Sequence, residues 1–128
     1  MMEPTIKSGR HLAENSCLNG SRFHDVNLAG AQFDDVNMSG VTFRNINMSD
    51  ISVCGVQMGG ARFSCIGLPP GAQGKQRPMS FEAADLNGTT FSKCYLSGVA
   101  ISDCDLDGMT IDGVLVTDLF TAFRNKAK

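Results

Sequence analysis

The sequence predicts an all-β solenoid of four-sided coils with a short helix at its C-terminus, and three observations lead to this fold class. Every fifth residue is apolar over two long stretches, 18–68 and 81–116. Glycine, aspartate or asparagine stands two residues after most of these apolar positions. Residues 117–128 then change to a helical pattern. A period of five matches neither an α-helix nor simple strand alternation, but it suits a short extended segment followed by a turn.

The period of five divides the chain into repeat units, each named here after its apolar unit centre. The residue two before the centre is small or apolar in nearly every unit, and both residues lie on one side of an extended segment. Glycine, aspartate and asparagine tolerate a positive φ, so their position predicts the turn of each unit. The unit centres are Leu18, Phe23, Leu28, Phe33, Met38, Phe43, Met48, Val53, Met58, Phe63, Leu68, Phe81, Leu86, Phe91, Leu96, Ile101, Leu106, Ile111 and Val116.

Four units are expected to close one coil of twenty residues, and successive coils are expected to stack through backbone hydrogen bonds. Residues twenty apart then form columns, of which Phe23, Phe43 and Phe63 are one. Phenylalanine falls on two opposite sides of the coil, whereas leucine and methionine dominate the other two. The unit centres fill such an interior and leave no room in it for a substrate.

The units V-N-L-A-G, V-N-M-S-G, A-D-L-N-G and C-D-L-D-G resemble the pentapeptide-repeat family. The resemblance covers residues 16–118 apart from one insertion. It implies a right-handed quadrilateral β-helix. It also implies a distant similarity to Qnr-type proteins, which dimerise through their C-terminal ends and present an acidic, DNA-like rod to DNA gyrase.

The chain is expected to form a single domain, because its length suits one continuous core. The expected parts are an N-terminal cap at 1–15, repeat coils at 16–70 and 79–118, a protruding loop at 71–78 and a helical cap at 117–128.

The protruding loop is recognised by its prolines, since Pro69, Pro70 and Pro78 cannot donate to a backbone ladder. Lys75 and Arg77 make it basic, and loops on rigid scaffolds often carry binding function. It is either a partner-binding element or a tolerated insertion.

The C-terminal helix has an apolar face of Leu119, Phe120 and Phe123, with Thr117 or Asp118 as its N-cap. A helix this short needs a packing partner. That partner is the last coil, or a second copy in a homodimer, and the two arrangements can coexist.

Composition excludes several classes of function. Eleven basic and thirteen acidic residues give a net charge of −2, which argues against direct nucleic-acid binding. Five irregularly spaced cysteines argue against a disulfide framework or a metal site. No signal peptide or membrane span is seen, so a reduced cytoplasmic protein without a cofactor is expected.

Charged residues are the candidates for partner binding, because acidic residues gather on one side and toward the C-terminus. They form an electrostatic docking surface or simply keep the protein soluble. The candidate partner-binding residues are Asp34, Asp35, Glu82, Asp85, Asp103, Asp105, Asp107, Lys75 and Arg77.

The sequence favours a non-enzymatic scaffold that binds protein partners through flat faces, its loop or its ends. The alternative is a DNA-mimicking modulator or protector of a type II topoisomerase, DNA gyrase. Enzymatic activity is not expected, since the neighbours His24 and Asp25 are predicted to lie on an outward face with no cleft around them.

Overall fold

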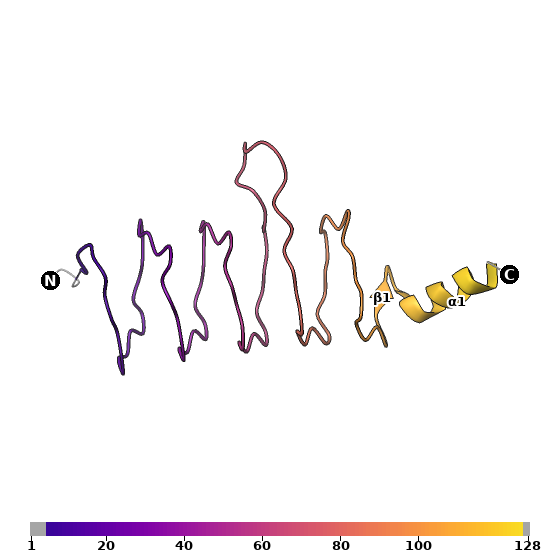
Figure 1. Cartoon of the computed structure of the whole chain (residues 1–128), viewed down its shortest axis with the longest axis horizontal. Coiled ribbons are helices and arrows are strands. Elements are labelled where there is room, and N and C mark those ends of the chain that lie inside the picture. The colour runs from indigo at the N-terminus through magenta and orange to yellow at the C-terminus, as the bar shows by residue number, and fades with distance from the viewer. Residues whose placement is uncertain (1–4, 127–128) are drawn as a thin grey trace. The chain divides into compact units, whose positions relative to one another are not determined.

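The computed structural model describes residues 5–126, which fall into two units, Met1–Ala61 and Arg62–Lys128. The regular elements belong to the second unit: strands β1 (Thr110–Ile111) and β2 (Val114–Leu115), then helix α1 (Val116–Lys126). In both units the rest of the described chain consists of short extended segments joined by corners. Figure 1 shows these corners as regularly spaced reversals of the backbone.

Tight turns form every second corner of the first unit. They begin at the unit centres Leu18, Leu28, Met38, Met48 and Met58, and each is closed by a hydrogen bond of 2.9–3.2 Å from the N–H three residues on to the carbonyl of the centre. The third residue of each turn is glycine or Asp50, with a φ of 62° to 76°. A positive φ at this position alone defines a type II turn.

Bends form the intervening corners of the first unit. They lie at Asn15, Asp25, Asp35, Asn45 and Gly55, where single residues have a φ of 49° to 66°. Asparagine and aspartate tolerate this left-handed conformation better than most residues. Leucine and methionine centres therefore precede tight turns, whereas bends follow the phenylalanine centres and Val53. The corner pattern repeats every ten residues.

The second unit continues the same alternation on both sides of the loop. Bends lie at Cys65, Ala83, Lys93 and Asp103, and tight turns begin at the leucine centres 86, 96 and 106. Between them, a turn closed by the Ala72 N–H and the Pro69 carbonyl at 3.1 Å opens a wide loop, which Figure 1 shows above the neighbouring corners. The loop replaces one tight-turn corner, and the order of corners is kept.

The expected stacking of coils is not present in this structure. Among the described residues, the only strand pairing joins β1 and β2, and residues twelve or more apart in the sequence do not approach within 8 Å at Cα. Within residues 5–108 the backbone hydrogen bonds close turns only. Phe23 and Phe43, predicted to stack, are each more than half exposed. The all-β, right-handed quadrilateral β-helix is therefore not confirmed. The hydrogen bonds that close the tight turns are local and do not require a neighbouring coil.

The C-terminal end departs from the repeat pattern before residue 118, where the coils were predicted to end. Asp112 and Gly113 both have a positive φ, 47° and 80°, which makes a type I′ turn between β1 and β2. The chain reverses there, and the Val116 N–H donates to the Met109 carbonyl at 3.0 Å. Val116, the last predicted unit centre, starts α1 instead and is the one buried apolar residue of the described chain.

The N-terminal end also differs from the prediction that 1–15 lies outside the repeats. Asn15 forms a bend with a φ of 49°, ten residues before the bend at Asp25. The repeat pattern therefore includes a unit centred on Ala13, which was overlooked because alanine is a weak hydrophobic marker. Residues 1–4, also predicted as part of the cap, lie outside the described residues.

Candidate partner-binding surface

Polar side chains hold the tight turns from the position just before the unit centre. In the first unit the Oδ1 atoms of Asn27, Asn37 and Asn47 accept hydrogen bonds of 2.9–3.0 Å from the backbone N–H two residues on. These Asx turns brace the corner from outside, since the side chain mimics a backbone carbonyl. This role was not predicted, although the sequence signals it as Asn-x-Ala or Asn-x-Ser around the leucine and methionine centres.

Two predicted partner-binding carboxylates make the same bond in the second unit. Asp85 Oδ1 accepts from the Asn87 N–H at 3.0 Å, and Asp105 Oδ1 accepts from the Asp107 N–H at 2.9 Å. Each carboxylate therefore braces a turn with one oxygen while it remains exposed. Asp105 and Asp107 flank one unit centre, and Asp85 occupies the equivalent place twenty residues earlier.

The other predicted acidic residues lie at bends. Asp35 and Asp103 are themselves the positive-φ residues of their bends, with φ of 53° and 51°. Asp34 and Glu82 directly precede bend residues. All four are exposed. Asp34 and Asp35 belong to the first unit, whereas Glu82 and Asp103 share the second unit with the carboxylates at the tight turns.

The loop candidates Lys75 and Arg77 lie in the segment between the turn at Pro69–Ala72 and the bend at Ala83, and both are exposed. Gly74, directly before Lys75, has a φ of 91° and turns the backbone at that point. Figure 1 shows the backbone of this loop extending beyond the tight turns of the same unit.

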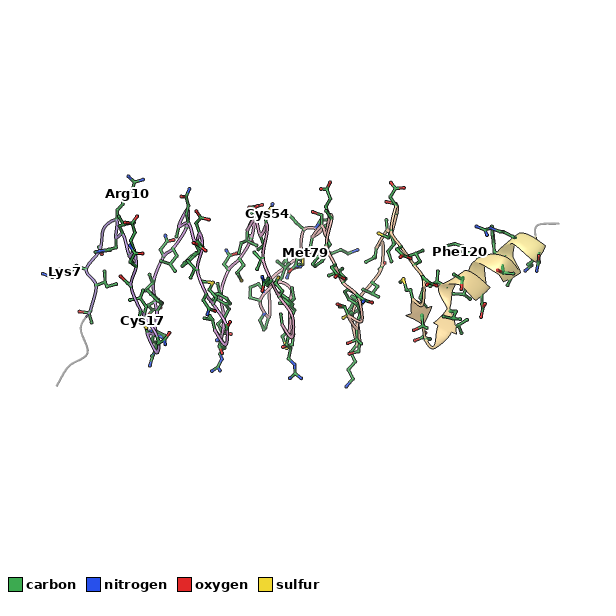
Figure 2. All side chains as sticks on the ribbon, turned by 90° about the horizontal axis from the view of Figure 1, so that it is seen from below. Lys7, Arg10, Cys17, Cys54, Met79 and Phe120 are labelled. Carbon is green, nitrogen blue, oxygen red and sulfur yellow. The ribbon has the colours of Figure 1, made fainter. Side chains whose placement is uncertain are left out.

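The apolar face of α1 is open to solvent. Leu119, Phe120 and Phe123 are 43%, 47% and 72% exposed, and Figure 2 shows Phe120 on the helix. The Arg124 guanidinium lies over the Phe120 ring, 5.9 Å from its centroid, which is within the range of a cation–π contact. Val116, at the start of the helix, anchors α1 against β2.

Groups with potential catalytic chemistry are dispersed. His24 Nδ1 lies 3.9 Å from Asp25 Oδ2, and both side chains are largely exposed. The five cysteines are free and exposed. Cys94 and Cys104 donate from Sγ to the carbonyls of Ser92 and Ser102. Residues 5–126 contain no group of three potential metal ligands, and no helix there has the length and apolarity to span a membrane.

One open depression of the first unit is lined by residues 9–12 and 27–32, and Figure 2 labels Arg10, which belongs to the first of these segments. The Cα atoms of the two segments do not approach within 8 Å of each other.

Comparison with known protein families gives one match. A family profile described as pentapeptide repeats matches residues 13–45 and 80–114, with eight copies of the repeat. Its first residue coincides with the Ala13 unit that the bend at Asn15 reveals. No curated protein matches the chain, and no solved structure does.

Proposed function

This chain belongs to the pentapeptide-repeat family, and from that premise we propose that it is a scaffold that binds protein partners through the outward faces of stacked, four-sided coils. Pentapeptide-repeat proteins are generally protein-interaction scaffolds and are generally not enzymes. The architecture in this proposal is the right-handed quadrilateral β-helix, in which neighbouring coils pair through their backbones.

The exposed apolar centres and the unpaired backbone groups of the open coils support stacking. Two tight turns and two bends make up each twenty residues, which is the number of corners that one four-sided coil needs. The apolar centres are on average about half exposed, Phe33 by 60%. Fully burying a side chain of this size contributes about 1.5–3 kcal/mol. Closing the coils would bury these centres and pair the free N–H and C=O groups of the extended segments.

A constant corner with variable outward residues is the observation that carries the binding role. The position after the centre of a tight turn holds Ala29, Ser39, Ser49, Asn87 or Asp107, yet the closing hydrogen bond stays at 2.9–3.2 Å. The surface can therefore change chemistry from coil to coil without changing the backbone. Such a surface suits recognition of another macromolecule better than catalysis, which needs converging groups in a cleft.

The partner class that fits the second unit is a basic protein surface. Asp85, Asp105 and Asp107 are exposed at equivalent tight turns, and Glu82 and Asp103 lie at the intervening bends. Negative charges at regular spacing attract a positively charged groove and speed encounter with it. A type II topoisomerase such as DNA gyrase has such a DNA-binding groove, so DNA mimicry is the second candidate function, favoured by these carboxylates.

Charge removal without loss of the turns tests the binding surface. Asp85→Asn and Asp105→Asn keep the Oδ1 acceptor that Asn37 and Asn47 already provide, and Asp107→Ser places there the residue found at Ser39; together they remove three charges. Asp34→Asn with Asp35→Asn is the matched control on the first unit. Cross-linking with affinity capture should lose a basic partner in the triple variant only; capture that is identical for wild type, triple variant and control would refute the acidic docking surface.

A separate assay decides between the two candidates. Purified DNA gyrase is assayed for supercoiling with added protein, with and without a fluoroquinolone. Inhibition or drug protection that is lost in the triple variant supports the topoisomerase role. If micromolar protein neither inhibits supercoiling nor protects gyrase from the drug, the topoisomerase role is excluded and the general scaffold role remains.

Hydrogen exchange of the extended segments tests stacking independently, since paired coils protect those amides and open coils do not.

A further inference from the structure

We propose that the turn at Asn87–Gly88 is a site of spontaneous covalent modification, at which the Asn87 side chain deamidates after attack by the Gly88 backbone nitrogen. Asparagine is among the thermolabile residues of proteins. Asn87 and Gly88 are exposed and occupy the middle of the tight turn that the Thr89 N–H and the Leu86 carbonyl close at 3.0 Å. This site goes beyond the proposed scaffold role and does not depend on it.

The reaction needs only water. The Gly88 nitrogen bonds to Cγ of Asn87, the bond from Cγ to Nδ2 breaks, and ammonia leaves with the proton that the amide nitrogen loses. Water then opens the resulting succinimide. Attack at the former side-chain carbonyl gives aspartate, whereas attack at the main-chain carbonyl gives isoaspartate. No oxidant or reductant takes part, and one negative charge is gained.

The structure leaves both reacting groups free at this turn. Neither the Asn87 side-chain amide nor the Gly88 N–H makes a hydrogen bond within residues 5–126, because Asp85 supplies the Asx acceptor instead. A Cβ built on Gly88 would meet no atom within 4 Å, so no other part of the chain crowds this glycine.

Asparagines that directly precede tight turns are held differently. The Oδ1 atoms of Asn37 and Asn47 accept from the N–H of Ser39 and Ser49, and a methionine follows each asparagine. Unlike Gly88, these methionines carry a side chain next to the backbone nitrogen that would attack. These two residues are therefore internal controls that should retain their amides. Asn19 precedes Gly20 in a turn of the same kind and should react like Asn87.

Asp107 shows that an aspartate is compatible with this position of the turn. At the equivalent position twenty residues on, Asp107 occupies a turn closed at 3.0 Å and donates its N–H to Asp105. Deamidation thus converts A-D-L-N-G into A-D-L-D-G, which matches C-D-L-D-G. The turn should persist while the group of exposed carboxylates at Asp85, Asp105 and Asp107 gains a fourth member. Isoaspartate would instead lengthen the backbone inside the turn and disrupt it.

Ageing of the full chain tests the proposal. The protein is incubated warm at mildly alkaline pH, separated by ion exchange, and mapped by peptide mass spectrometry with isoaspartyl methyltransferase labelling. The acidic species should carry the modification at position 87 or at position 19, and these two sites should account for the early charge shift. The variant Asn87→Gln should lose the acidic species that is modified at position 87. Conversion of Asn37 or Asn47 as fast as Asn87, or an intact Asn87 amide, would overturn the proposal.

The consequence for structure has its own test. Asn87→Asp should keep the wild-type far-UV circular dichroism and urea midpoint, and it should elute like the aspartate form of the aged protein. A clear loss of stability in this variant would refute the claim that the turn accepts the product.

Discussion

Replacing Gly60 by alanine is expected to destabilise the protein, whereas the same replacement at its neighbour Gly59 is expected to preserve or raise stability. Both glycines are central residues of one tight turn, but only Gly60 has a positive φ, 75°. A Cβ at either position meets no atom within 4 Å, so steric clash does not distinguish them. A left-handed conformation costs an alanine about 1–2 kcal/mol, while alanine at a compatible position stabilises by about 0.4–1 kcal/mol through the unfolded chain.

The two alanine variants should therefore differ by about 1.5–3 kcal/mol in unfolding free energy. This is a large share of the total stability of a small domain, about 5–15 kcal/mol. Urea unfolding followed by far-UV circular dichroism measures the difference. Gly60→Asn is the control and should lose less than alanine, because Asp50 adopts a φ of 62° at the same turn position. Equal stability of Gly59→Ala and Gly60→Ala would refute the assigned turn geometry.

Three further changes test other parts of the chain. Asn37→Ala should cost about 0.5–1.5 kcal/mol in urea unfolding, because it removes an Asx hydrogen bond of 2.9 Å, while Asn37→Asp keeps the acceptor and should cost less. Val116→Ala should cost about 1.6 kcal/mol, from two buried carbons at about 0.8 kcal/mol each, and an unchanged melting temperature would contradict its role as the anchor of α1. Phe43→Asp should abolish cooperative unfolding if the coils stack, since an unpaired buried charge costs several kcal/mol, whereas a cooperatively folded variant would count against the inward column.

The corners of this protein could be predicted from local sequence. The positions of the turns after Leu28 or Met38 follow from glycine two residues beyond an apolar centre, and the helix near residue 117 follows from its own amphipathic pattern. The division of corners into tight turns and bends was not predicted, although it follows the identity of the centre. The side-chain bonds of Asn27 and Asp85 were not predicted either, because an Asx bond depends on which of two similar corner conformations the backbone adopts.

The other wrong prediction concerned where the repeat pattern ends along the chain. Ile111 and Val116 continue the apolar period, yet they belong to a hairpin and a helix, because Asp112 and Gly113 together adopt the left-handed conformation and reverse the chain. Val116 is buried only because that reversal returns the backbone to Met109. Spacing within five residues determines each corner, since the turn bonds and backbone preferences act over that range. Where the repeat stops, and which apolar residue is buried there, depends on contacts between segments that a period in the sequence does not specify.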